Sequence, residues 1–194
     1  MAKQLALGSV LGAVVLFVWS FIAWTFIPWP GEPLRSFTSE DAMVTAIKAN
    51  APSSGNYLLP NEVKRAAGMT DEQFKAAQQA AMEKMSRGPV IFAAIRLEPF
   101  GSMTKPLVIK FVSLLVVALL ASVLLAQTSG LSYITRVALF TIIGLIIFGG
   151  SSVDEWNWFG FSNAYTAMQL AVQAIGWFLA GLVMSIFVRG RSTA

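Results

Sequence analysis

Four long runs of this sequence contain no charged residue, and they constrain the fold more than any other feature. They cover residues 4–31, 111–135, 137–153 and 156–188. About 20 consecutive apolar residues are enough to cross the hydrocarbon core of a bilayer as a helix. The chain is 56% hydrophobic and only 12% charged, whereas an average soluble domain carries about 25% charged residues. The sequence therefore predicts an all-α integral membrane four-helix bundle.

Span one lies at the start of the chain and is expected to be a retained anchor. Its apolar run is longer than the roughly 7 to 15 residues of a signal-peptide core, and FIAWTF offers no small-x-small cleavage site. A small α+β extracytoplasmic domain is expected between spans one and two. The predicted parts are 1–29 for span one, 30–105 for the α+β domain, and 106–194 for spans two to four (about 106–126, 132–150 and 163–188) with a C-terminal tail.

The polar insert contains two helix-start signals. Thr38 can cap a first helix, with Glu40 and Asp41 in its positive first turn. Thr70 and Gln73 in MTDEQF form a capping box for a second helix. The insert therefore has two predicted helices.

Two short apolar segments of the insert are predicted to be strands. Residues 57–59 are a short apolar run ended by a proline, and residues 90–95 are apolar at every position. The second pattern suits a strand that is covered on both faces. The second helix also has one apolar side, formed by Phe74, Ala77, Ala81, Met82 and Met85.

An insert of this size buries little core on its own. We therefore expect it to rest on the membrane face of the spans or on a partner. Residues 31–104 expressed alone are expected not to give a cooperative, well-dispersed fold.

The orientation follows from the basic residues near the spans. Arg189 and Arg191 flank span four closely, and short flanking segments rich in lysine and arginine stay in the cytoplasm. Both termini and the turn with Arg136 are then inside, and segment 30–105 is outside. Loops longer than about 60 residues translocate regardless of their charge, so the basic residues of the insert do not contradict this orientation.

The segment SSVDEWNWFGFSN, residues 151–163, then lies on the outer side. We expect an interfacial collar, with carboxylates in water and aromatic rings in the headgroup layer. A docking patch or a re-entrant element is the alternative. The candidate residues for this outer interface or partner contact are Asp154, Glu155, Trp156, Trp158, Phe159, Trp24 and Trp29.

Span four carries a polar stripe that is predicted to turn toward other helices. In lipid, amides bond across helices and small residues allow close approach. Binding of a polar ligand or lipid headgroup, or contact with another subunit, are the alternatives. The stripe consists of Thr166, Gln169, Gln173, Gly176 and Ala180, with matching small-residue faces at Gly8 and Gly12 in span one and at Ala118 and Ser122 in span two.

The composition argues against most enzyme chemistry. The chain has no cysteine and no histidine, so thiolate nucleophiles, imidazole bases and the common transition-metal sites are excluded. We expect no catalytic residue, cofactor or metal, and the scattered basic residues behind the net charge of +4 do not predict nucleic-acid binding. No ionisable residue lies deep in a span, which argues against a proton-coupled transporter. A pore formed by an oligomer remains open.

Five segments resemble an uncharacterised family of small four-span bacterial membrane proteins. They are NYLLP, RGPVIFAAIR, TSGLSYITR, EWNWFGF and IGWFLAGLV, in this order. The resemblance implies a bacterial inner membrane with the long insert in the periplasm. It implies no activity, cofactor or site residue.

The features together favour a non-catalytic accessory, scaffold or assembly subunit of a larger membrane complex. Its partners are expected to be membrane lipids and membrane proteins or further copies of the chain. The alternative is a membrane protein that binds a lipid or another hydrophobic ligand. A stoichiometric protein partner after gentle extraction would favour the first reading, and a bound lipid the second.

Overall fold

The chain is mostly helical and divides into two compact units. The computed structural model describes residues 2–188. The helical unit takes in the chain up to Leu34, Gly101–Trp156 and the chain from Phe161, and the inserted unit comprises Arg35–Phe100 and Asn157–Gly160. In chain order the elements are α1 (Ala2–Thr25), α2 (Glu40–Asn50), β1 (Gly55–Leu59), α3 (Asp71–Arg87), β2 (Ile91–Ile95), α4 (Thr104–Ala126), α5 (Tyr133–Gly149), α6 (Ser152–Phe159) and α7 (Asn163–Phe187).

Four stretches in residues 2–188 are helical, long and apolar enough to cross a membrane, as the sequence predicts. They are Ala2–Thr25, Thr104–Ala126, Tyr133–Phe159 and Asn163–Phe187, with mean hydropathies of 2.4, 2.7, 1.9 and 2.0. The arginines that set the expected orientation, Arg189 and Arg191, lie outside the described residues.

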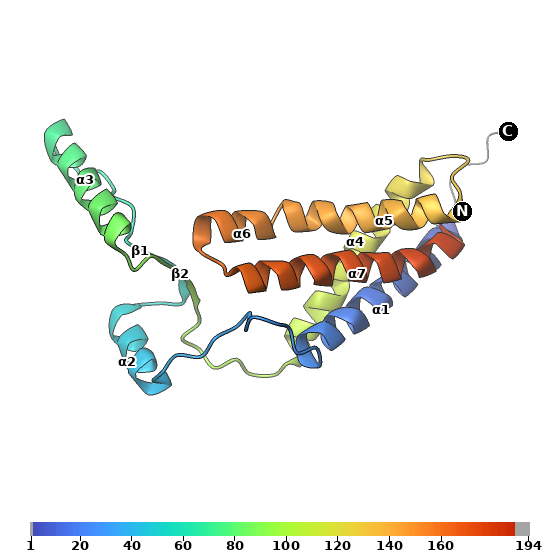
Figure 1. Cartoon of the computed structure of the whole chain (residues 1–194), viewed down its shortest axis with the longest axis horizontal. Coiled ribbons are helices and arrows are strands. Elements are labelled where there is room, and N and C mark those ends of the chain that lie inside the picture. The colour runs from blue at the N-terminus through green and yellow to red at the C-terminus, as the bar shows by residue number, and fades with distance from the viewer. Residues whose placement is uncertain (1, 189–194) are drawn as a thin grey trace. The chain divides into compact units, whose positions relative to one another are not determined.

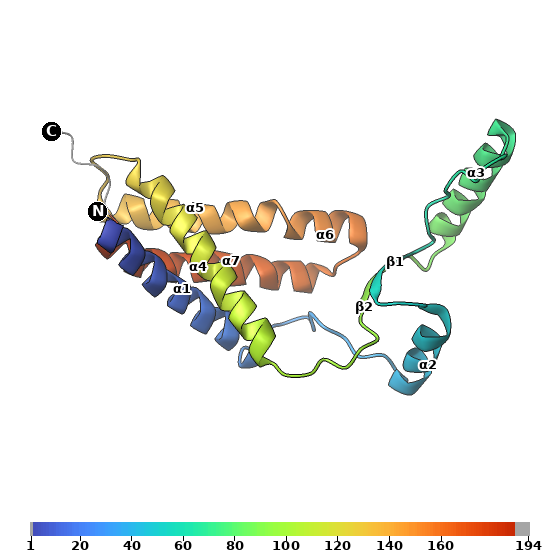
Figure 2. The ribbon, with the colours of Figure 1, turned by 180° about the vertical axis from the view of Figure 1, so that it is seen from behind.

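The helical unit is a layer of three helices crossed by a fourth. Helix α7 packs against α5 on one side and against α1 on the other (Figure 1). Helix α4 packs mainly on α1 and runs obliquely over one face of this layer, as Figure 2 shows. The buried core draws on all four helices and is formed by Ala13, Leu16, Ala118, Ala121, Leu125, Phe140, Trp177, Ala180, Met184 and Val188.

Serine caps begin two of the long helices. The hydroxyl of Ser132 accepts a hydrogen bond from the Thr135 amide, and that of Ser162 accepts one from the Tyr165 amide. A serine just before the first helical residue satisfies an amide that has no partner inside the helix. Both helices therefore begin close to the predicted boundaries at 132 and 163.

The segment 151–163, for which the sequence signals no helix, contains one. Helix α6 follows α5 after Gly150 and Ser151, and the amide of Glu155 donates to the Ser151 carbonyl at 3.2 Å. A loop looked reasonable because glycine, serine and two carboxylates interrupt the apolar run. Asp154 and Glu155 instead occupy the first turn of α6, where the helix dipole favours negative charge.

The inserted unit has the predicted order helix, strand, helix, strand, with one correction at α2. Ser39, and not Thr38, is the N-cap, and its side chain accepts from the Ala42 amide. The capping residue must immediately precede the first helical residue, which is Glu40. Glu40 and Asp41 lie in the first turn as expected.

The capping box of α3 is confirmed. The Gln73 amide donates to Thr70 Oγ1 at 3.2 Å, and the Thr70 amide donates to Gln73 Oε1 at 3.0 Å. The helix ends at Gly88, whose φ of 66° suits a residue without a Cβ.

The two strands pair antiparallel, with Tyr57 opposite Ala93 at the centre of the register. The prediction that the second strand is covered on both faces is wrong, because every residue of Ile91–Ile95 is exposed or half-buried. Leu59 and Ile91 remain 52% and 44% exposed. An unbroken apolar run predicts burial, but a sheet of two strands with no helix packed on both faces cannot provide it.

Candidate interaction surfaces

The small residues predicted on α1 and α7 receive large side chains from the facing helix. A Cβ added to Gly12 would overlap the thioether of Met184, and one on Gly8 would lie 2.7 Å from a methyl group of Val188. Ala180 is completely buried. The two helices therefore approach as closely as they do because Gly8 and Gly12 have no side chain.

Two tryptophans use glycines on neighbouring helices in the same way. The Trp19 ring lies over Gly176, where a Cβ would come within 2.7 Å, and the Trp177 ring lies over Gly144, within 2.6 Å. The Trp19 indole N–H also donates to the Val172 carbonyl at 2.9 Å. The α1–α7 and α5–α7 contacts thus combine shape complementarity with a hydrogen bond.

The polar members of the predicted stripe do not join helices. Gln169 and Gln173 are half-buried, and within residues 2–188 neither side chain makes a hydrogen bond. Thr166 donates back to the Ser162 carbonyl in its own first turn. The buried face of α7 follows Met168 and Val172 in steps of four residues toward Gly176, and the glutamines lie to one side of it.

Serine and tyrosine make the helix-to-helix hydrogen bonds that were assigned to the glutamines. The Ser9 hydroxyl donates to Ser122 Oγ at 3.1 Å and joins α1 to α4. The Tyr133 hydroxyl donates to the Leu182 carbonyl at 2.7 Å and joins α5 to α7. Ser122 was in a predicted small-residue face, but Ser9 and Tyr133 were missed. The position of Ser9 between Gly8 and Gly12 was the available signal.

Arg136 fastens the start of α5 to the end of α7. Its guanidinium donates to the Leu131 carbonyl at 2.7 Å and to the Ser185 carbonyl at 3.0 Å. Cations near a helix C-terminus interact favourably with the helix dipole. The Nε of Arg136 and the hydroxyl of Ser185 are buried without a hydrogen-bond partner.

Aromatic residues gather at the opposite end of the helical unit. The Trp29 indole N–H donates to the Ala23 carbonyl at 2.7 Å and so caps the last turn of α1. The Trp24 and Tyr165 rings meet edge to face with centroids 6.3 Å apart. A hollow of about 180 Å³ lies beside these residues, lined by Trp24, Ile27, Trp29, Pro33, Leu34 and Met168.

Of the predicted outer-interface residues, five lie on helix α6, and Trp24 and Trp29 lie at the end of α1 and just after it. Asp154 is exposed and Glu155 half-buried. The Trp156 indole N–H donates to Asn163 Oδ1 at 2.7 Å, which links α6 to the start of α7. Trp158 is 73% exposed, and the Phe159 ring lies 4.4 Å from that of Phe92, a residue of the inserted unit to which Phe159 also belongs.

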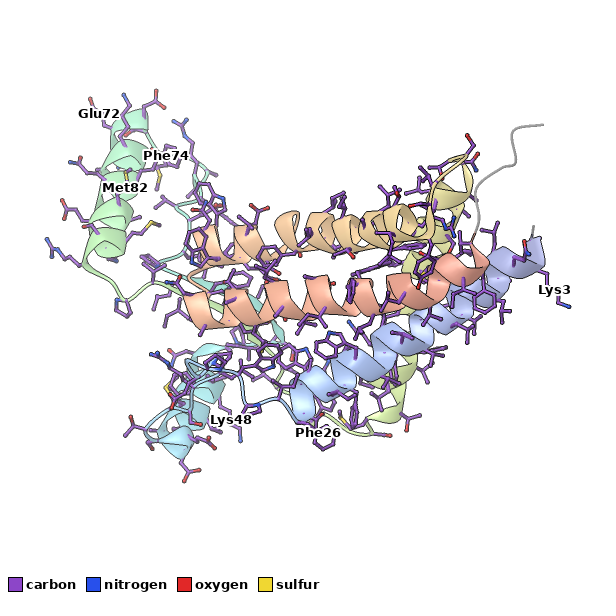
Figure 3. All side chains as sticks on the ribbon, turned by 45° about the vertical axis from the view of Figure 1, so that its right-hand side comes forward. Lys3, Phe26, Lys48, Glu72, Phe74 and Met82 are labelled. Atoms are coloured by element: carbon purple, nitrogen blue, oxygen red, sulfur yellow. The ribbon has the colours of Figure 1, made fainter. Side chains whose placement is uncertain are left out.

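Helix α3 of the inserted unit has an apolar side that its own unit leaves uncovered. Met82 and Met85 are 72% and 51% exposed, and Phe74 is half-buried. Figure 3 shows Phe74 and Met82 projecting from α3, with Glu72 near its beginning. In Arg35–Phe100 the one buried residue is Ala51.

One hydrogen-bonded carboxylate lies beside the sheet. The Ser54 hydroxyl donates to Glu98 Oε2 at 2.6 Å, and the Leu97 amide donates to Ser54 Oγ at 2.8 Å. The hydrogen bond from Ser54 lowers the pKa of Glu98, and a backbone hydrogen bond and nearby Arg96 lower it further. This arrangement orders the chain after β2.

Over residues 2–188, no three side chains of the metal-ligating types lie close enough to hold a metal ion together. Comparisons of the chain with protein-family models, curated proteins and solved structures found no match.

Proposed function

We propose that the chain is a multi-pass protein of a bacterial inner membrane and a non-catalytic accessory, scaffold or assembly subunit of a larger membrane complex. In this proposal both termini are cytoplasmic and residues 30–105 are periplasmic. The partner is a membrane protein that covers the apolar surface of the inserted unit.

The outward surface of the helical unit supports membrane insertion. Leu124 and Ile146 are 66% and 67% exposed, although they lie in the last turns of long apolar helices. Such side chains would be costly in water, at about 25 cal/mol per Å² of apolar surface, and are favourable in hydrocarbon. Lys3 lies near the end of α1 that the proposal places in the cytoplasm, and Trp24 lies near the other end.

The observation that carries the functional proposal is the absence of a core in the inserted unit. With Ala51 as the one buried residue of Arg35–Phe100, the unit buries too little apolar surface to offset the conformational entropy of ordering its chain. Between Phe74 and Met85, helix α3 offers an apolar stripe about three turns long that suits the groove or helix of another protein. A partner protein on this surface would bury the exposed apolar side chains of the inserted unit and so stabilise its fold. It would also bind at a defined place.

Gentle detergent extraction followed by native mass measurement tests this proposal. Wild-type protein should carry a second protein in fixed stoichiometry, and Met82→Glu should lose it, because a carboxylate would have to be buried at the contact. Ala76→Glu adds the same charge to the exposed opposite side of α3 and should retain the partner. Retention of the partner by Met82→Glu, or loss in both variants, would contradict a contact through this face.

The orientation has its own test, since the chain has no native cysteine. Gln79→Cys should react with a membrane-impermeant maleimide from the outer side, and Gln127→Cys in the turn after α4 should react only after permeabilisation. Labelling of both from the same side would overturn the topology and with it the periplasmic contact.

Binding of a lipid or another hydrophobic ligand is the second candidate function. It is favoured by grooves with apolar walls, of which one, about 340 Å³ in volume, lies between α1 and α4 and is lined by Val14, Phe17, Leu107, Val108 and Phe111. The same native mass measurement separates the two candidates. This candidate predicts a monomer or homo-oligomer that carries lipid, with no second protein.

A further inference from the structure

The sheet of the inserted unit has two free edges. Strands β1 and β2 pair only with each other in the part of the chain that the structure describes. The outer edge of each strand therefore presents backbone N–H and C=O groups without a strand partner. A two-stranded sheet alone is marginally stable in water, and a third strand or a packed helix is usually needed.

Neither strand carries the devices that normally protect an edge. Edge strands of soluble proteins are blunted by charged side chains, prolines or bulges. Gly55–Leu59 and Ile91–Ile95 contain no charged residue and no proline, and their register runs without a bulge over all five pairs. Uncharged, regular edges of this kind are templates for a further strand.

The sequence of β2 is complementary in size to itself. If two copies of β2 run antiparallel about Ala93, then Ile91 faces Ile95 of the other copy on one side of the sheet. On the other side Phe92 faces Ala94, a large residue opposite a small one. β-Branched residues pack well against their cross-strand neighbours, and an alanine opposite a phenylalanine leaves room for the ring.

The edge of β1 lacks this symmetry. About its centre at Tyr57, Leu59 would face Gly55 and Leu58 would face Asn56, so each apolar side chain would meet a glycine or an amide. Glycine within a strand also weakens it, and the Tyr57 hydroxyl is already bound to the Ser53 carbonyl at 2.6 Å. Self-pairing is therefore favoured at β2.

We propose that β2 pairs with β2 of a second copy, antiparallel and centred on Ala93, so that two inserted units share one four-stranded sheet in the order β1-β2-β2-β1. The contact is isologous, as in most homodimers, because identical strands related by a two-fold axis pair antiparallel. Each inserted unit carries eight basic and seven acidic residues, so charge repulsion between the two copies does not oppose the contact. This inference goes beyond the proposed function, because self-association requires no other protein.

The absence of native cysteine makes a cross-linking test direct. Purified Ala93→Cys protein in lipid nanodiscs or native membranes should form a disulfide dimer under mild oxidation, because residues directly opposite have Cβ atoms about 4.5 to 5.5 Å apart. A mixture of Phe92→Cys and Ala94→Cys chains with different tags should give the mixed dimer. Asn56→Cys on β1 should stay monomeric under the same conditions.

A second measurement covers the case in which a cysteine variant does not fold. Wild-type protein should have twice the monomer mass, and Ala93→Lys should return it to the monomer, because two like charges would face each other across the axis. Asn56→Lys, on the other strand, should leave the dimer intact.

A wild-type monomer, or cross-linking at Asn56→Cys that equals cross-linking at Ala93→Cys, would overturn the pairing. If the chain is monomeric but retains a second protein, the pairing fails and the proposed function stands. If it dimerises through β2 with no other protein bound, the pairing stands and the proposed function fails.

Discussion

The two units of this chain use apolar residues in opposite ways. In the helical unit, glycines receive tryptophan, methionine and valine side chains, and Phe140 and Met184 are completely buried. In Arg35–Phe100, methionines, isoleucines and phenylalanines remain exposed around a single buried alanine. The helical unit buries its core through contacts between its own helices. The inserted unit leaves apolar side chains exposed, as one side of a protein–protein interface does before its partner binds. Stability should therefore depend on the first unit and assembly on the second.

The same substitution in both units should give the largest contrast. Phe140→Ala should lower the free energy of unfolding by about 2 to 3 kcal/mol, because van der Waals contacts are lost around a cavity even where lipid removes most of the hydrophobic term. Phe37→Ala, at a residue that is 63% exposed, should change it by less than about 0.5 kcal/mol. Titration with a denaturing detergent measures both. Equal losses would show that the inserted unit has a core of its own.

Adding a methyl group tests the close approach of α5 and α7. Gly144→Ala should cost about 1 to 3 kcal/mol, because the new Cβ would lie 2.8 Å from the Gln173 carbonyl oxygen, which cannot move without shifting α7. Gly149→Ala in the same helix meets nothing within 4 Å and should be neutral. The detergent titration again reports the difference, and a neutral Gly144→Ala would contradict the interlocked packing.

Two ring substitutions compare hydrogen bonds of the same kind. Trp19→Phe removes the donor to the Val172 carbonyl and should cost about 1 kcal/mol, because no water replaces the N–H between helices. Tyr57→Phe removes the donor to the exposed Ser53 carbonyl, which water can satisfy, and should cost less than half as much. If the tyrosine variant proves the more costly of the two, the inserted unit is more ordered than its exposure indicates.

The smallest effect is a pH dependence within the inserted unit. The pKa of Glu98 is lowered from its ordinary value of 4.5, so its contribution is fully present above that value and is lost as the pH falls through the lower folded pKa. Carboxyl carbon chemical shifts should show this titration. Ser54→Ala should move the pKa of Glu98 upward, and an unchanged pKa would mean that the Ser54 hydroxyl does not hold the carboxylate.

The sequence predicts the elements of this chain better than their contacts. The apolar runs locate the long helices to within a few residues, and the capping box at Thr70 locates α3, because length and capping are local properties. Helix α6 was missed because two glycines and two carboxylates interrupt the pattern that a hydropathy reading needs. Trp19 and Arg136 donate to the Val172 and Ser185 carbonyls of α7. These acceptors are backbone atoms, so no residue type in the sequence marks them.

Two predictions about side-chain contacts were wrong for the same reason. The glutamines of α7 were expected to bond across helices, and the second strand was expected to be covered on both faces. Both inferences follow from residue chemistry, but the direction of a side chain depends on which face of the element meets a neighbour. Tertiary packing determines which face is buried. A pattern of a few residues in a helix or strand is compatible with more than one buried face.

The hydrogen bonds at the two ends of the α5–α7 pair fix more than the distance between these helices. Trp156 of α6, the helix that follows α5, is bound to Asn163 at one end, and Tyr133 and Arg136 of α5 hold the carbonyls of Leu182 and Ser185 at the other. A shift of one helix along the other by a single residue, about 1.5 Å, would break all of these bonds together. These bonds therefore oppose piston-like sliding of one helix along the other.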